Sequence, residues 1–128
     1  MNSREKGKRG ERMAAAKWRE SGFDARRGVQ YKGGPDSPDV IGPPGVHIEV
    51  KFTERLHLWD ALAQSKRDAG PDEMPIVMHK ANGTEWVVIQ PFDDWVELYK
   101  ANELDDFMQI WKEAEALRIL KEEGVTIP

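Results

Sequence analysis

The stretch PDSPDVIGPPGVHIEVK, residues 35–51, constrains the fold more than any other part of the chain. Pro43-Pro44-Gly45 separates two short apolar runs, so we expect a β-hairpin whose strands cover residues 39–42 and 46–52. Because the turn returns the chain on itself, the start of the first strand is expected near the middle of the second.

The second strand of this hairpin carries its charges on one face only, because successive side chains point to opposite faces. The apolar face carries Val46, Ile48, Val50 and Phe52. The other face carries His47, Glu49 and Lys51. With Asp39 returned by the turn, two carboxylates and one ammonium converge at one end of the hairpin. The alternative is an amphipathic strand with a solvent-exposed ion pair, which contributes at most about 1 kcal/mol.

The periodicity of the remaining chain predicts the other elements. Helices are expected at residues 3–21, at 56–69, from Pro91 or Phe92 onward, and at 105–124; further strands are expected at 23–29, 74–80 and 85–90. The order α, β-β-β, α, β-β, α-α predicts an α/β domain with a mixed sheet flanked by helices. The length of 128 residues suits a single domain, with a core at about 5–90 and a helical extension at about 91–128.

Composition and charge narrow the function classes. No apolar run approaches the roughly 20 residues of a membrane span, and no secretory signal opens the chain, so we expect no membrane association. The absence of cysteine excludes disulfides and thiolate metal sites and favours a cytoplasmic protein. Residues 1–32 hold ten basic and four acidic residues, a net charge of +6, whereas residues 33–128 sum to −10. The basic segment is either a positive face for a polyanion or a solvated helix.

The hairpin residues resemble a known family. Pro38-Asp39 followed by Glu49-Val50-Lys51 is similar to the Pro-Asp…Glu-x-Lys core of the restriction-endonuclease-like, PD-(D/E)XK, nucleases. The segments EKGKRGER and SGFDARR resemble the N-terminal part of archaeal-type Holliday junction resolvases and their phage relatives. Gln64, on the next helix, resembles a glutamine found there in that superfamily. The strand pair MPIVMHK and EWVVI also matches, so the resemblance covers about residues 5–90.

The resemblance implies a metal-dependent endonuclease. Asp39 and Glu49 would bind Mg²⁺, with the backbone carbonyl of Val50 as a third ligand, and Mn²⁺ is expected to substitute. Mg²⁺ prefers oxygen ligands, neutralises phosphate charge and generates a hydroxide-like nucleophile at neutral pH. Lys51 would orient or polarise the attacking water, or stabilise the charge that develops on the phosphate.

Glu11 has two interpretations. It falls on the same side of the first helix as an apolar stripe, so its carboxylate begins at the margin of a buried face, where a metal cluster or its water would be a suitable partner. Alternatively, Glu11 is a surface residue paired with Lys8 or Arg12.

Other polar residues are weaker candidates. A helical glutamine is usually only solvated, so a catalytic role for Gln64 comes from the resemblance. Asp36 also follows a proline, but Asp39 is preferred because it directly precedes the strand-like VIG, whereas Asp36 lies in a turn-rich loop. His47 shares the face of Glu49 but is expected farther from Asp39, and the histidines lack zinc-ligand spacing.

The partner is expected to be DNA, and the resemblance favours branched DNA. The residues expected to contact its phosphates are Arg4, Lys6, Lys8, Arg9, Arg26, Arg27 and Lys32. Symmetric cleavage of a four-way junction needs two active sites, so the resemblance implies a homodimer, and apolar positions in residues 91–128 suit either packing on the core or a dimer interface. The alternatives are a restriction- or repair-type nuclease of the same fold and a non-catalytic DNA-binding module.

Overall fold

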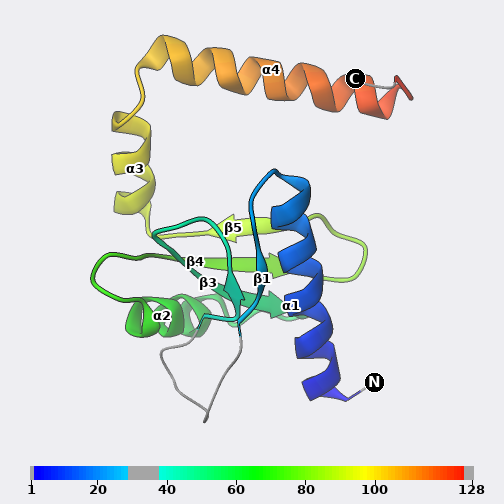
Figure 1. Ribbon diagram of the computed structural model, residues 1–128, viewed down its shortest axis with the longest axis vertical. Coiled ribbons are helices and arrows are strands. Elements are labelled where there is room, and N and C mark those ends of the chain that lie inside the picture. Colours follow the sequence, from blue (N-terminus) through cyan, green and yellow to red (C-terminus); the bar gives the residue numbers. More distant parts are fainter. Residues whose placement is uncertain (1, 29–37, 126–128) are drawn as a thin grey trace. The chain divides into compact units, whose positions relative to one another are not determined.

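The computed structural model describes residues 2–28 and 38–125 (Figure 1). The chain forms two compact units, Met1–Gln90 and Pro91–Pro128, which we describe separately. The first unit contains α1 (Ser3–Glu20), β1 (Arg26–Arg27), β2 (Val40–Ile41), β3 (Val46–Phe52), α2 (Leu58–Asp68), β4 (Met74–Lys80) and β5 (Val87–Ile89). The second contains α3 (Phe92–Lys100) and α4 (Leu104–Glu122). This order confirms the predicted α/β fold class.

The five strands form one mixed sheet in the order β1-β2-β3-β4-β5. Strands β3 and β4 are parallel, with Glu49 opposite Val77, and helix α2 makes the crossover between them. The other pairs are antiparallel, and the predicted hairpin is present, with Val40 opposite Ile48. The central strand β3 therefore pairs with β4 over residues 46–52 and with β2 at Ile48.

Helix α1 lies across one face of the sheet (Figure 1). Ala14 and Ala15 are buried there against the apolar side of β3, which includes Ile48 and Val50. Small residues let the helix approach closely, and a Cβ added at Gly10 would lie 2.5 Å from the Cβ of Phe52. The predicted apolar face of the hairpin strand is thus the face that α1 covers.

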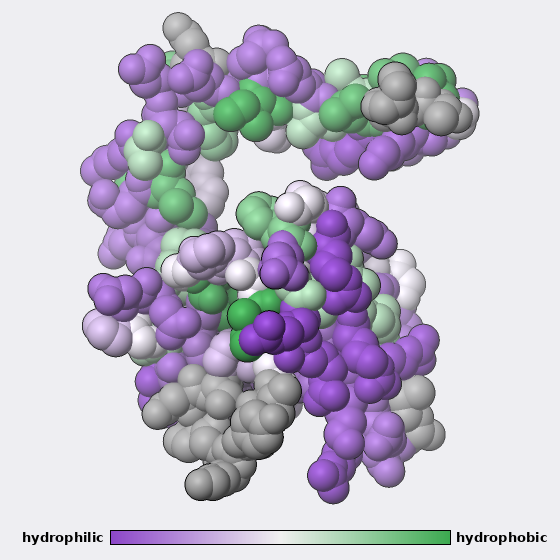
Figure 2. Space-filling view, in the orientation of Figure 1, coloured by the Kyte–Doolittle hydropathy of each residue, from purple (hydrophilic) through white to green (hydrophobic). Residues whose placement is uncertain are grey.

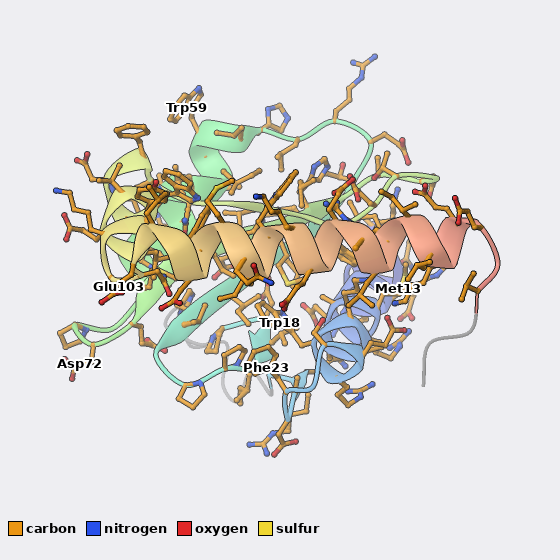
Figure 3. All side chains as sticks on the ribbon, turned by 90° about the horizontal axis from the view of Figure 1, so that it is seen from above. Met13, Trp18, Phe23, Trp59, Asp72 and Glu103 are labelled. Carbon is orange, nitrogen blue, oxygen red and sulfur yellow. The ribbon has the colours of Figure 1, made fainter. Side chains whose placement is uncertain are left out.

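Helix α2 covers the other face of the sheet. Ala61 and Leu62 pack with Val77, and the hydroxyl of Ser65 donates to the carbonyl of Ile76 at 2.9 Å. Trp59 lies on the outer side of α2, is 78% exposed and projects away from the fold (Figure 3). Because α2 covers this face, the charged side of β3 is buried rather than solvated.

This burial corrects one interpretation of the sequence. The relative exposure of His47 is 0% and that of Glu49 is 1%. The alternative of a solvent-exposed ion pair on an amphipathic strand is therefore wrong. A buried carboxylate needs compensating partners, which makes the surroundings of Glu49 the part of the fold that requires a physical explanation.

Some element boundaries differ from expectation. Strand β1 covers only Arg26–Arg27 rather than 23–29, of which residue 29 lies outside the described chain. The residues before β1 connect it to α1, and among them Phe23 packs edge-on against Trp18 of α1 at a ring-centroid distance of 5.5 Å. Helix α2 begins at Leu58, and β5 is shorter than residues 85–90.

The second unit consists of two helices joined by a short turn. Trp95 and Tyr99 stack within α3, and Tyr99 meets Phe107 of α4 edge-on at 4.9 Å. Several large apolar side chains of α4 are exposed, among them Ile110 and Trp111. Within the described ranges, neither α4 nor any other helix combines the length and apolar character needed to span a membrane.

Candidate active site

Asp39 is held in place by three contacts with neighbouring backbone. Its own N–H donates to the carbonyl of Ile48 at 3.0 Å, and its carbonyl accepts from Gly28 at 2.9 Å. Its carboxylate oxygen Oδ2 accepts from the N–H of Val50 at 2.8 Å. The carboxylate is thereby fixed beside strand β3, directly ahead of β2, as the hairpin turn predicts. Asp36, the alternative acid, lies outside the described residues.

The carboxyl groups of Asp39 and Glu49 are hydrogen-bonded to each other. Burial and the adjacent negative charge of Glu49 raise the pKa of Asp39 from 3.8 to about 7. Burial also raises the pKa of Glu49, as do the nearby carboxylates of Asp68 and Glu11, whereas the hydrogen bond to Asp39 and the ammonium of Lys51 act in the opposite direction. A bound cation would act against these upward shifts, because a positive charge beside the two acids favours their ionised forms.

Lys51 lies next to this acid pair on β3 and reaches toward α2. Its ammonium donates to the side-chain carbonyl of Gln64 at 3.1 Å. Both residues line an open cleft of about 350 Å³ together with Thr53 and His57. The structure thus brings Gln64 to Lys51, and the pair faces a space that a ligand can enter.

Glu11 comes from α1 to the same region, but with a different partner from those expected. Its Oε2 accepts from Arg27 Nε of strand β1 at 2.8 Å, and its side chain is 19% exposed. Neither Lys8 nor Arg12 is that partner; Lys8 lies 3.9 Å from Glu5 instead. The negative charge of Glu11 still acts on the pKa of Glu49, so Glu11 lies in the electrostatic range of the acid pair.

A second cleft, of about 430 Å³, adjoins Glu11 and carries part of the predicted basic surface. It is lined by Arg4, Lys8 and Arg27 together with the small residues Gly7 and Gly28. Hydrophilic side chains also cover the exposed side of α1 (Figure 2). Cations at the rim of an open cleft suit the binding of phosphate groups.

The other predicted basic residues have different surroundings. Lys6 and Arg9 lie over the ring of Phe52, with the charged groups 5.0 and 5.9 Å from its centroid. Arg26 is exposed on β1. Lys32 lies outside the described residues.

His47 and Asp68 were not identified as site residues from the sequence. His47 Nε2 lies 3.0 Å from Glu49 Oε1, and ligand atoms of His47, Glu49 and Asp68 lie within 4.8 Å of one another. The only sequence signal was the alternation of β3, which places His47 on the face of Glu49. Asp68 gave no signal, because its approach depends on how α2 crosses the sheet.

The donor set beside β3 suits a hard divalent cation. Asp39 and Glu49 offer carboxylate oxygens whose pKa values are raised, and a dication beside them would favour the ionised form of both. The N–H of Val50 donates to the carboxylate of Asp39, and the backbone carbonyl of Val50 is the third ligand expected from the sequence. These residues fit a Mg²⁺ site by the chemistry of their donors.

Comparison of the chain with known proteins gives a structural match but no sequence match. No protein-family model matches the chain, and no curated protein sequence matches it. A solved structure of Archaeoglobus fulgidus Hjc, a Holliday junction resolvase from an archaeal hyperthermophile, matches with a TM-score of 0.48 and 25% sequence identity. The match covers 66% of this chain and 72% of that one.

Proposed function

We propose that this protein is a metal-dependent endonuclease that hydrolyses phosphodiester bonds of DNA, with a preference for branched DNA such as a Holliday junction. The observation that supports this most directly is the convergence of Asp39, Glu49 and Lys51 beside one strand, with Gln64 bonded to the lysine. Two buried acids and a positioned ammonium lower the stability of a fold because charged groups lose their hydration. The same groups can bind a metal ion and stabilise the negative charge that develops during phosphodiester hydrolysis.

Asp39 and Glu49 would hold Mg²⁺, or Mn²⁺ in its place, with the carbonyl of Val50 as a further ligand. The ion, when bound, would neutralise phosphate charge and lower the pKa of a bound water. The protein's own contribution is to hold the carboxylates in place, which the backbone contacts of Asp39 support.

Lys51 would place its positive charge against the scissile phosphate or the attacking water. Its hydrogen bond with Gln64 limits where the ammonium can reach, so Gln64 is a positioning residue in this proposal. Glu11 would act at a longer distance, by adding negative charge beside Glu49 and by holding Arg27 at the edge of the basic cleft.

The preference for branched DNA rests on the resemblance to resolvases and on the basic surface of α1. A symmetric dimer would present two such surfaces and two metal sites to a junction, where several phosphate backbones converge. Recognition would follow shape and phosphate position rather than base sequence.

Cleavage of end-labelled DNA tests the chemistry. With Mg²⁺ present, Asp39→Asn, Glu49→Gln and Lys51→Ala should each lose at least about 100-fold in rate. Glu20→Gln and Lys17→Ala are matched controls, because these residues form an exposed pair 3.9 Å apart and should leave the rate unchanged. Full activity in any of the three site variants would remove that residue from the mechanism, and a wild-type protein that binds DNA without cutting it would favour the DNA-binding module.

A comparison of substrates tests the preference for junctions. A four-way junction should receive paired nicks at related positions in opposing strands, and single-stranded, flap and linear duplex DNA of the same sequence should be cut more slowly. Sedimentation should show a dimer at micromolar concentration. A monomer that cuts linear duplex as readily as the junction would leave the metal chemistry and overturn the resolvase assignment.

The salt dependence of DNA affinity tests the basic cleft. Replacing Arg4 and Lys8 with glutamine should weaken binding on every DNA and lower the slope of log K against log salt by about 0.9 per lost phosphate contact. Lys112→Gln and Lys121→Gln on α4 remove the same charge elsewhere and serve as the matched control. An unchanged slope in the cleft variant would show that the DNA binds another surface.

A further inference from the structure

A cluster of four titratable side chains lies where the end of α2 meets β3. His47 and Glu49 come from the charged face of the strand, Asp68 is the last residue of α2, and Glu73 follows in the turn before β4. His47, Glu49 and Asp68 are 0%, 1% and 8% exposed. The proposed nuclease reaction uses only Glu49 of these four, so the other three need a separate explanation.

The spacing of the first two groups fits cation binding. His47 Nε2 and Glu49 Oε1 are 3.0 Å apart, and an oxygen of Asp68 lies within 4.8 Å of both. Two ligands of a tetrahedral Zn²⁺ ion, each about 2.1 Å from the metal, are separated by about 3.4 Å. An ion could therefore bind both atoms with little movement of β3, and Asp68 would complete three ligands by a small side-chain adjustment.

The charge of the cluster also favours a cation. Glu49 and Asp68 place two carboxylates in a buried region, and the negative charge of Asp68 is one of the causes that raise the pKa of Glu49. Arg67 approaches Asp68 to 3.6 Å, but its side chain is 69% exposed, and the ammonium of Lys51 is hydrogen-bonded to Gln64. Neither side chain supplies a buried positive charge between the two carboxylates.

The hydrogen bonding of His47 also favours a bound cation. Its Nδ1 is buried and has no hydrogen-bond partner among the described residues, although Glu73 Oε1 lies 3.9 Å away. Glu73 is itself fixed, because the same oxygen accepts from the N–H of Gly70 at 2.7 Å. If Nε2 donates to Glu49, Nδ1 carries a lone pair that faces a carboxylate. If Nε2 binds a metal, Nδ1 carries the proton and faces a suitable acceptor, as in most histidine–metal sites.

We propose that His47, Glu49 and Asp68 form a second cation site, beside the Asp39–Glu49 pair, that takes a borderline transition-metal ion of the Zn²⁺ class. One imidazole and two carboxylates favour such an ion over Mg²⁺, which prefers oxygen ligands alone. Glu73 orients the imidazole from the outer side. The site goes beyond the proposed nuclease function and exists whether or not the protein cuts DNA.

Calorimetric titration of the whole protein with Zn²⁺ in excess Mg²⁺ tests this site. The wild type should bind one Zn²⁺ per chain, and His47→Asn and Asp68→Asn should each weaken Zn²⁺ binding at least about 10-fold. Asp60→Asn, which changes an exposed acid of the same helix, should leave the affinity unchanged. Failure of the wild type to bind Zn²⁺, or equal binding by the His47 variant, would overturn the proposal.

Asp39→Asn separates the two sites. It should abolish Mg²⁺-dependent cleavage and leave the Zn²⁺ affinity within about threefold of wild type. A loss of Zn²⁺ binding as large as that of His47→Asn would show that the ion occupies the Asp39–Glu49 pair, which would overturn a separate site. Zinc binding without any DNA cleavage would instead contradict only the proposed function.

Imidazole ¹⁵N spectra of the wild type provide a test that needs no substitution within the proposed site. Addition of Zn²⁺ should shift the signals of His47 alone, with Nε2 as the ligand and Nδ1 protonated. A response from His57 or His79, with His47 unchanged, would overturn the assignment. His57 is exposed and His79 bonds the carbonyl of Thr53, so His57→Ala and His79→Gln identify their signals.

Discussion

Replacement of Asp39 by asparagine should stabilise the metal-free protein at alkaline pH. In the folded protein the pKa of Asp39 is raised from 3.8 to about 7, by burial and then by the charge of Glu49. Between those two pH values the folded state keeps a proton that the unfolded chain has released, so the free energy of unfolding falls as pH rises. Asparagine mimics the protonated acid, because its carbonyl can accept from Val50 and its amide can donate to Glu49.

The magnitude follows from the size of the pKa shift. A shift of about 3 pKa units corresponds to about 4 kcal/mol as an upper limit. Asp39 is partly exposed and its ionisation is coupled to that of Glu49, so about half of that limit is expected. Without metal, Asp39→Asn should exceed wild type in free energy of unfolding by about 2 kcal/mol near pH 8, and by about 1 kcal/mol near pH 5.

Urea unfolding in EDTA, followed by circular dichroism at the two pH values, measures this difference. Glu20→Gln, which changes an exposed acid of α1, should show no such pH-dependent gain. Addition of Mg²⁺ should then stabilise wild type and leave Asp39→Asn unchanged. A stability difference that stays constant between pH 5 and pH 8, or an asparagine variant that is less stable at pH 8, would refute the coupling of the two buried acids.

Three further substitutions test the packing that positions the site. Gly10→Ala places a Cβ 2.5 Å from the Cβ of Phe52, so α1 must move and thermal unfolding should show a loss of about 1–3 kcal/mol. Gly28→Ala places a Cβ 2.1 Å from the carbonyl oxygen of Pro38, so it should displace the carboxylate of the adjacent Asp39 and reduce cleavage by up to about 100-fold. Gln64→Ala removes the side-chain oxygen that accepts from the ammonium of Lys51 at 3.1 Å, and cleavage kinetics should show a lower kcat at unchanged KM. Normal unfolding in the first, or normal cleavage in the other two, would contradict these contacts.

The local part of the site could be predicted because its residues are close in sequence. Asp39 and Val50, whose carboxylate and N–H are hydrogen-bonded, are separated by only one tight turn. Strand alternation then places Glu49 and Lys51 on one face without knowledge of the rest of the fold. The predicted element order was confirmed for the same reason, since each strand and helix has its own periodic pattern and its own turn residues.

The partners contributed by distant elements could not be predicted in this way. Glu11 was expected to pair along its own helix, but it pairs with Arg27 because β1 runs beside α1. Asp68 reaches the strand only because the parallel crossover brings the sheet-facing side of α2 over β3. Residue spacing within one element predicts which side chains share a face, and it carries no information about which other element covers that face.

The charged face of β3 is best understood as a binding surface that lowers the stability of the metal-free protein. The opposite face of the same strand packs Ile48 and Val50 against α1, whereas the face that α2 covers carries the buried polar residues His47 and Glu49. Apolar residues would avoid the desolvation of a buried acid pair, which often destabilises a fold by more than its internal attractions return. Raised pKa values for Asp39 and Glu49 are the sign of that uncompensated cost. A bound cation removes it, so the folded protein should gain stability from divalent metal in proportion to how many of these acids it allows to ionise.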